Sequence, residues 1–325
     1  MTDRKTHLDG VAVITLVTCC ALWGLNHSIT KLTLEHLPPL LQAGLRSLGA
    51  ALLVALWARW RGHSLSMRNG TLTGGLLAGT SFALEFACIF VGLQFTEASR
   101  MIVFIYLAPF VVALGMPLVA RSERPTALQL LGLGVAFSGV AWAFAEGLTD
   151  SAGPGQAQRW IGDALGLLAA LLWGANTLTI RTSRLATAAP VQTLYYQLAV
   201  SGPLLVAASL LAGEVWPAPG GLGLRPWLLM GFQTVVVTFA SYLLWFWLLR
   251  RYPATRVTAF TLLTPLFGLL AGVLMLGEPL TLRLGVACAA VVVGIALVNR
   301  PPPKAAAGGA PGLSPARSAP GPGRT

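Results

Sequence analysis

The chain has 325 residues, of which 55% are hydrophobic and only 10% are charged, and its mean hydropathy is +0.71. A soluble domain of this size does not need so apolar a composition for its core, so the composition excludes an ordinary soluble protein and indicates a polytopic membrane protein. The formal net charge is +11, but the basic residues are distributed over many short loops, so no nucleic-acid partner is expected.

Ten apolar runs, separated by charged or Pro- and Gly-rich breaks, follow one another along the chain. They cover residues 11–31, 39–60, 71–95, 99–120, 128–145, 160–181, 191–212, 227–249, 257–276 and 284–298. A hydrocarbon core of about 30 Å needs roughly 20 apolar residues per helix. The runs lack the alternation of barrel strands, and helices satisfy their own backbone in lipid. We therefore predict an all-α polytopic membrane protein with ten transmembrane helices.

Arg4 and Lys5 precede the first apolar run, as in a signal peptide. No small-residue cleavage site follows the run, so we expect a retained first helix.

All four cysteines lie inside predicted spans: Cys19, Cys20, Cys88 and Cys288. They lack the spacing of a metal site, which favours buried apolar packing. No redox role, metal or cofactor is expected.

The distribution of Lys and Arg predicts the orientation. Outside the spans, sixteen basic residues fall on the side of the N-terminus and five on the other side. The five are Lys31, Arg100, Arg159, Arg225 and Arg283. By the positive-inside rule, we expect both termini in the cytoplasm and the chain in the cell inner (plasma) membrane. Residues 1–10 are then a cytoplasmic N-terminus, and the Pro-, Gly- and Ala-rich residues 301–325 a disordered cytoplasmic tail.

Similar segments recur in the same order through both parts of the chain. Trp-Gly-x-Asn occurs at 23–26 and again at 173–176. Two further pairs are "ASRMIVFIYLAP" at 98–109 with "ATRVTAFTLLTP" at 254–265, and "SERPT" at 122–126 with "GEPLT" at 277–281. Repetition with nearly constant spacing is the mark of a duplicated structural unit.

The duplication divides the chain into two five-helix halves, residues 11–145 and 160–300, joined by a linker at 146–159. Because five is an odd number, the second half enters the membrane in the opposite direction to the first. We therefore predict an inverted-topology repeat, an arrangement suited to alternating access.

These motifs resemble the drug/metabolite transporter superfamily, EamA type. The resemblance lies in ten spans in two halves, the repeated Trp-Gly-x-Asn, Pro109 and Pro265 in the fourth spans, and "SE" or "GE" with a following Thr before the fifth. It covers residues 11–300, although "EPLTLRLG" at 278–285 is shortened and has Arg283 in place of the usual Gln. The resemblance implies a basket of helices around a central cavity and export of small metabolites, with aromatic amino-acid exporters most similar in overall pattern.

Trp23 and Trp173 lie too deep for the interfacial belt, each about eight residues, or roughly 12 Å, from a span end. The other tryptophans lie near span ends or in a loop: Trp57, Trp60, Trp142, Trp160, Trp216, Trp227, Trp245 and Trp247. Trp23 and Trp173 are either large fillers at helix contacts or paired walls around a central substrate. Gly24 and Gly174 beside them allow close helix approach or bending.

Four polar residues lie deep in the predicted spans, where lipid offers no hydrogen-bond partner. The amides of Asn26 and Asn176 either hydrogen-bond a neighbouring helix or face a polar substrate. Arg46 and Glu85 are the deep basic and acidic residues, at depths of roughly 10 and 15 Å. They form either a structural ion pair or a cavity lining in which Arg46 attracts a carboxylate and Glu85 an ammonium group or a proton. Their repeat partners are Tyr196 and Ser241, so the charged pair is asymmetric.

Tyr106 and Tyr242 also lie away from the belt, and a buried tyrosine hydroxyl usually finds a partner. Pro109 and Pro265 each remove a helix hydrogen bond, which predicts kinks that expose carbonyl groups to a cavity. The two prolines, with Gly24 and Gly174, are the predicted hinges.

Three further residues have expected roles outside the cavity. His27 follows Asn26 without a counterpart in the second half, and we expect a solvated or helix-capping side chain. Arg100 and Arg256 occupy matching positions near the fourth spans and are expected to be snorkelling anchors.

The residues and the resemblance together predict a carrier that exports amino acids, including aromatic ones, by alternating access. A cationic or lipophilic drug exporter is the alternative, since aromatic walls and one carboxylate also suit cations, and a passive channel is another. No nucleophile–base pair or second deep carboxylate accompanies Glu85, so no enzyme is expected, and no GxxxxGK[ST] loop indicates ATP coupling. The expected partners are a small-molecule substrate and the lipid bilayer, and the assembly considered is a monomer.

Overall fold

The computed structural model describes residues 8–65, 70–119, 126–149, 158–252, 257 and 260–298. The expectations for Arg256, for residues 1–7, for most of the linker and for the tail at 301–325 fall outside this part of the chain.

Every regular element in the described residues is a helix. The elements are α1 (Gly10–Leu34), α2 (Pro39–Trp60), α3 (Leu72–Gly92), α4 (Ala98–Ile105), α5 (Ala108–Val119), α6 (Ala127–Thr149), α7 (Arg159–Thr182), η2 (Arg184–Thr187), α8 (Pro190–Leu211), η3 (Pro219–Gly221), α9 (Leu224–Gly231), η4 (Phe232–Ser241), α10 (Tyr242–Arg251), η5 (Phe260–Leu262), α12 (Leu263–Leu276) and α13 (Leu282–Val298). Eight helical stretches are long and apolar enough to cross a membrane, and two shorter apolar helices, at Phe260–Leu276 and Leu282–Leu297, occupy the last two predicted spans. The prediction of an all-α membrane protein with ten helical spans is confirmed.

Local chemistry sets several helix ends. Pro39 and Pro190 begin α2 and α8, where a missing N–H is not needed by the helix. The Asp9 carboxylate caps α1 by accepting a hydrogen bond from the Ala12 N–H at 2.9 Å. Gly277 ends α12 with φ at 64°, a left-handed conformation that glycine adopts without steric penalty. These signals explain why the observed bounds follow the predicted spans closely.

Three of the predicted spans are not uniform α-helices. The fourth is broken at Tyr106 and Leu107 into α4 and α5, and Pro109 lies in the first turn of α5. The ninth starts with the short η5, and Pro265 lies in the first turn of α12. The eighth runs from α9 through the π-helical η4 into α10. Both prolines therefore occupy the first turn of an α-helix that follows an interruption of its span, where their rings fit without a clash.

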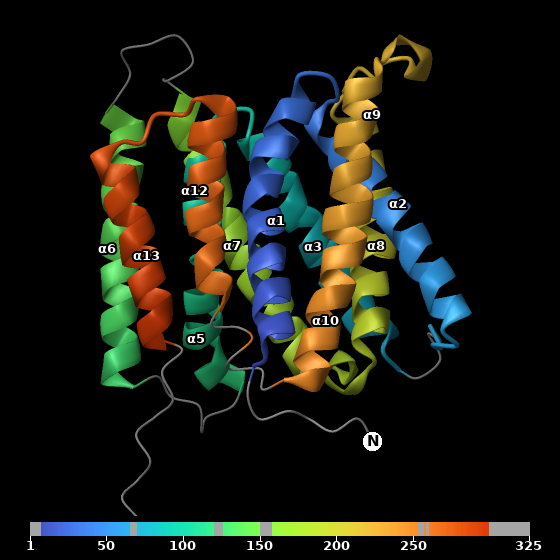
Figure 1. The fold of residues 1–325 in the computed structure, drawn as a ribbon, viewed down its shortest axis with the longest axis horizontal. Coiled ribbons are helices and arrows are strands. Elements are labelled where there is room, and N and C mark those ends of the chain that lie inside the picture. Colours follow the sequence, from blue (N-terminus) through green and yellow to red (C-terminus); the bar gives the residue numbers. More distant parts are fainter. Residues whose placement is uncertain are drawn as a thin grey trace, which may run out of the picture.

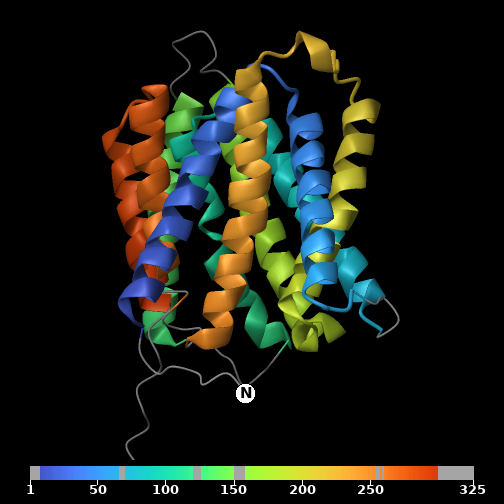
Figure 2. The same ribbon diagram turned by 45° about the vertical axis from the view of Figure 1, so that its right-hand side comes forward.

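The helices run between two ends of a single bundle (Figure 1). We name the end where α1 begins the N-terminal end, and the opposite end, where α4, α7 and α13 begin, the distal end. The pairs α6–α13, α2–α8, α3–α7, α1–α12 and α5–α7 pack against each other. Each pair joins one helix from the first half of the chain to one from the second, and the turned view in Figure 2 shows the interleaving. The core therefore forms between the halves.

Glycine allows the closest of these approaches. A Cβ atom added at Gly24 would lie 2.6 Å from the Gly268 backbone nitrogen of α12. A Cβ atom added at Gly174 would lie 2.5 Å from Val111 Cγ1 of α5. The two copies of the Trp-Gly-x-Asn motif thus place their glycines at close contacts with the other half, which is the packing use of small residues in membranes.

Candidate functional site

Trp23 lies in an aromatic cluster between α1 and the eighth span. Its ring centroid is 6.1 Å from that of Tyr242 and 5.1 Å from that of Trp245, both edge-to-face. Its Nε1 donates a hydrogen bond to the Ser241 Oγ at 2.8 Å. The Trp245 ring packs on Trp23 and also against a buried cluster that includes Leu16 and Leu248, and its place in the interfacial belt stays a prediction.

Trp173, in the second half of the chain, packs on a tyrosine of the first half. Its ring lies 5.7 Å from that of Tyr106, at 84°, and Tyr106 sits at the break between α4 and α5. Each deep tryptophan therefore pairs edge-to-face with a predicted tyrosine from the opposite half of the chain. The sequence indicated the four residues separately, but the pairing of Trp23 with Tyr242 and of Trp173 with Tyr106 emerges only in the fold.

Arg46 is held by aromatic rings instead of a carboxylate. Its side chain is 1% exposed, and its guanidinium carbon lies 4.1 Å from the ring centroid of Phe86 and 5.0 Å from that of Phe90. Its buried Nε and Nη2 atoms have no hydrogen-bond partner within the described residues. These two nitrogens share the edge of the guanidinium that can bind a carboxylate with two parallel hydrogen bonds.

Glu85 lies near Arg46 without contacting it. The residue is 6% exposed, and its Oε2 is also buried without a hydrogen-bond partner within the described residues. Between these two described residues there is no ion pair within 4.0 Å, so the structural ion pair considered above is not formed. Buried charged groups are normally paired or hydrogen-bonded, so the unpartnered atoms of both residues make them candidates for contact with a ligand.

The repeated asparagines also carry buried polar atoms without hydrogen-bond partners. Asn26 and Asn176 are buried, and the Oδ1 of each lacks a hydrogen-bond partner in the part of the chain that the structure describes. His27 lies in the interior of α1, not at a helix end, and its Nδ1 is buried in the same way. The expectation of a solvated or capping histidine is therefore wrong. Within the described residues, buried groups without partners thus include donors on Arg46 and acceptors on Glu85 and the two amides.

A second group of charged residues lies at the distal end, and we call it the distal cluster. It consists of Lys31, Glu97, Arg100, Glu146, Arg159, Asp163 and Glu278. Arg100 is 2% exposed and forms ion pairs with Asp163, with Glu146 at 2.8 Å and with Glu97 at 3.7 Å. The expectation that Arg100 snorkels to the membrane surface is wrong, since three carboxylates hold its guanidinium inside the protein.

The rest of the distal cluster surrounds the start of α4. Glu278 accepts hydrogen bonds from the N–H groups of Ala98 and Ser99 at 2.7 and 2.9 Å, and Lys31 Nζ lies 3.6 Å from the same carboxylate. Arg159 pairs with Glu97 at 2.9 Å. Hydropathy analysis missed this cluster because it assigned these residues to span edges. The sequence did contain one indication of the cluster: in the predicted topology, all seven residues lie on the side of the membrane opposite the N-terminus.

A neutral network also escaped the sequence analysis. Gln42 and Gln233 are fully buried, and the Gln233 Oε1 accepts hydrogen bonds from Thr30 Oγ1 at 3.1 Å and from Gln42 Nε2 at 3.2 Å. The Gln233 amide donates to Thr33 Oγ1 at 3.0 Å. The network connects α1, α2 and η4, which is the usual stabilising role of polar side chains between membrane helices.

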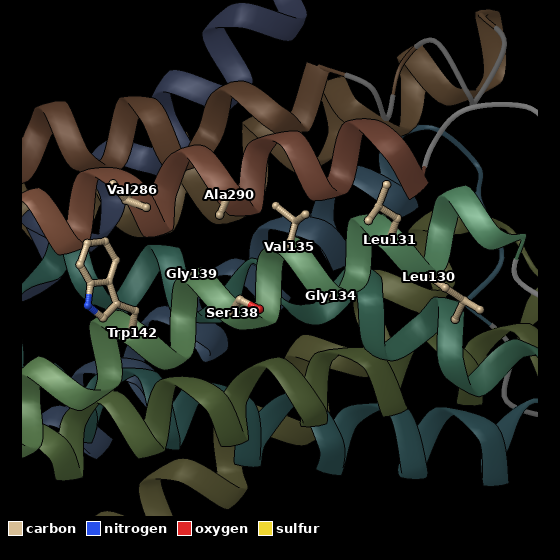
Figure 3. A pocket seen from close by; sticks show the side chains of 9 residues that line it. All are labelled: Leu130, Leu131, Gly134, Val135, Ser138, Gly139, Trp142, Val286 and Ala290. Atoms are coloured by element: carbon tan, nitrogen blue, oxygen red, sulfur yellow. The ribbon is translucent and has the colours of Figure 1, made fainter.

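A hollow of about 820 Å³ lies on the outer side of the α6–α13 pair (Figure 3). Leu130, Leu131, Trp142 and Val286 line it, and it contains none of the predicted site residues. Its apolar lining on an exposed face suits contact with lipid chains. The described residues contain no group of three or more His, Cys, Asp or Glu that could hold a metal ion.

Comparison with known proteins identifies the family. The model of the EamA-like transporter family matches residues 10–145 and, a second time, residues 160–300. The "Uncharacterized transporter YvbV" of Bacillus subtilis is 27% identical over 285 residues, which cover 86% of this chain and 88% of the relative. The "Probable amino-acid metabolite efflux pump" of Escherichia coli is 29% identical over 278 residues, covering 84% and 88%.

Two other comparisons bear on location and fold. The "Uncharacterized inner membrane transporter YedA" of Escherichia coli is 23% identical over 277 residues, covering 84% of this chain and 86% of the relative. A solved crystal structure aligns with 89% of this chain and 97% of its own, with a TM-score of 0.61 and 18% identity, and so shares the fold. The chain belongs to the EamA-like transporter family, as a multi-pass membrane transporter.

Proposed function

We propose that this transporter exports amino acids, including aromatic ones, or closely related metabolites from the cytoplasm. The observation that carries the proposal is a set of buried polar atoms without hydrogen-bond partners within the described spans. The set includes donors on Arg46 and acceptors on Glu85, Asn26 and Asn176. A zwitterion offers the matching groups, a carboxylate for the donors and an ammonium group for the acceptors. The name of the Escherichia coli relative, "Probable amino-acid metabolite efflux pump", agrees with this substrate class.

Arg46 would bind the substrate carboxylate through its Nε and Nη2 atoms. Phe86 and Phe90 hold the plane of the guanidinium, so little conformational entropy is lost when a carboxylate binds. Glu85 and the amide oxygens of Asn26 and Asn176 would accept hydrogen bonds from the ammonium group. Such charge-assisted hydrogen bonds are strong in a buried site.

The aromatic pairs would form the walls for the substrate side chain. Trp23 with Tyr242 and Trp173 with Tyr106 contribute flat apolar surface with polar tips, which suits an aromatic or aliphatic side chain. The same walls with Glu85 also suit a lipophilic cation, which is the second candidate substrate class.

Alternating access would use the two halves as moving parts. In Figure 1, α1 begins at the N-terminal end and α7 begins at the distal end, which supports an inverted relation between residues 11–145 and 160–300. Pro109 and Pro265 would act as hinges, because each lies just after an interruption of its span. The distribution of basic residues supports cytoplasmic termini in an inner membrane, with the distal end outside.

Uptake into proteoliposomes tests the proposal with a panel of labelled amino acids and lipophilic cations. We expect saturable counterflow of amino acids, and transport of cations without any amino acid would reverse the assignment. Arg46→Gln should weaken amino-acid affinity at least tenfold, or about 1.4 kcal/mol, because a bidentate charged contact is lost. Arg225→Gln removes the same charge from an exposed position and should have no effect. Single-channel currents would favour a passive channel instead.

A further inference from the structure

The distal cluster connects the two halves of the chain at one end of the bundle. Its contacts Lys31–Glu278, Arg100–Asp163 and Glu97–Arg159 each join a residue of the first half to α7 or to the segment between α12 and α13. The five ion pairs between described residues all belong to this cluster. At the N-terminal end, the described cross-half contacts include neutral ones such as the Tyr196 hydroxyl with Thr71 Oγ1 at 3.1 Å. The ion pairs between described residues are therefore concentrated at the distal end.

Helix α4 links this cluster mechanically to the candidate site. It has eight residues, so it is about 12 Å long. At its start, Glu278 caps the N–H groups of Ala98 and Ser99, and in the same first turn Arg100 is held by Asp163. At its other end, Tyr106 packs on Trp173. A displacement of the capped start of α4 would be transmitted over this short distance to the Tyr106–Trp173 pair.

We propose that the distal cluster is a latch that closes the distal end between the two halves, and that it opens to release substrate on that side. The inference goes beyond the proposed function but rests on its alternating access. In the closed state the seven side chains are joined by ion pairs, and Thr96 Oγ1 also donates to Asp163 at 2.7 Å. In the open state water replaces these contacts. An intact buried ion pair contributes little net stability, whereas removal of one partner strongly destabilises the state that buries the other. This makes ion pairs suitable for a reversible latch.

Distances between spin labels in lipid nanodiscs test the latch without any substrate. The four native cysteines are replaced by alanine, and cysteines are introduced at the exposed positions Gln94 and Leu280, which flank the latch on its two sides. We expect one short distance in the unmodified background. Asp163→Asn should raise the fraction of long distances about tenfold or more, because Arg100 loses its partner. Thr96→Val removes one hydrogen bond to the Asp163 carboxylate but leaves the ion pair, and it should give a smaller shift in the same direction.

Two controls separate opening of the latch from general loss of structure. Tyr196→Phe removes a cross-half hydrogen bond at the N-terminal end and should leave the Gln94–Leu280 distances unchanged. A second label pair, at the exposed Arg61 and Arg251, reports on the N-terminal end and should not lengthen in the latch variants. An unchanged distal distance in Thr96→Val and Asp163→Asn would overturn the latch, as would an equal shift in Tyr196→Phe. Because these distances need no substrate, failure of the latch and failure of the substrate proposal are distinguishable.

Discussion

Gly24 provides a direct test of how closely the two halves are packed. The residue lies in α1 beside Trp23, and α12 passes over it so closely that an added Cβ would meet the Gly268 nitrogen at 2.6 Å and the Phe267 Cβ at 2.8 Å. Gly24→Ala places a methyl group in this contact. Since two of the opposing atoms belong to backbone or to a Cβ, rotation of a side chain cannot relieve the clash.

The structure gives the size of the effect. To reach an ordinary contact of 3.4 Å, α1 and α12 must separate locally by about 0.8 Å. A gap of that size forfeits a quarter to a half of the dispersion energy of the contacts it opens. Overpacking of this kind costs about 1–3 kcal/mol. The separation would also stretch the hydrogen bond from Trp23 to Ser241, which is 2.8 Å long.

Thermal unfolding in detergent, followed by the fluorescence of tryptophan, measures the effect. We expect Gly24→Ala to lower the unfolding temperature by several degrees and Gly174→Ala to do the same, because it meets Val111 at 2.5 Å. The matched control is Gly134→Ala in α6, where an added Cβ has no neighbour within 4 Å. That variant should be neutral or more stable, since alanine favours helix more than glycine. Equal destabilisation by Gly24→Ala and Gly134→Ala would refute the close-packing argument.

Three further predictions concern a helix cap, a hinge and the buried carboxylate. Glu214 accepts hydrogen bonds from the first N–H groups of α2, so Glu214→Gln should cost about 1–2 kcal/mol of unfolding free energy without changing substrate selectivity in the panel. Pro109→Ala should slow turnover severalfold and leave equilibrium binding intact, as measured by transport and by isothermal calorimetry. Glu85→Gln should weaken substrate affinity at least tenfold, and unchanged affinity with unchanged pH dependence of transport would exclude any substrate or proton role.

Hydropathy and helix-start chemistry predict the spans well. The second span was expected at 39–60 and is Pro39–Trp60, because proline starts the helix and the bilayer sets its length. The break at Tyr106 and Leu107 was not predicted as an interruption, since both residues are apolar enough to continue a run. Proline at 109 signalled a kink but not its position. The change to a π-helix at Phe232–Ser241 left no recognisable signal in residue type.

The depth of a residue within a membrane span can be estimated from the sequence, but its neighbours on other helices cannot. Counting identified Trp23, Trp173 and Arg46 as residues that the bilayer does not explain. It could not show that the Trp245 ring contacts Trp23 of α1. It misjudged Arg100, because two of the three carboxylates that surround it, Glu146 and Asp163, come from distant parts of the chain.

The candidate site differs between the two halves of the chain in both charge and hydrogen bonding. Arg46 and Glu85 have Tyr196 and Ser241 at the equivalent positions of the second half. Both equivalents are hydrogen-bonded to the first half, Tyr196 to Thr71 and Ser241 to Trp23. The second half thus offers satisfied neutral groups where the first offers open charged ones. A substrate bound through Arg46 and Glu85 would interact differently with the two halves, and a ligand shifts a conformational equilibrium only through such a difference between states.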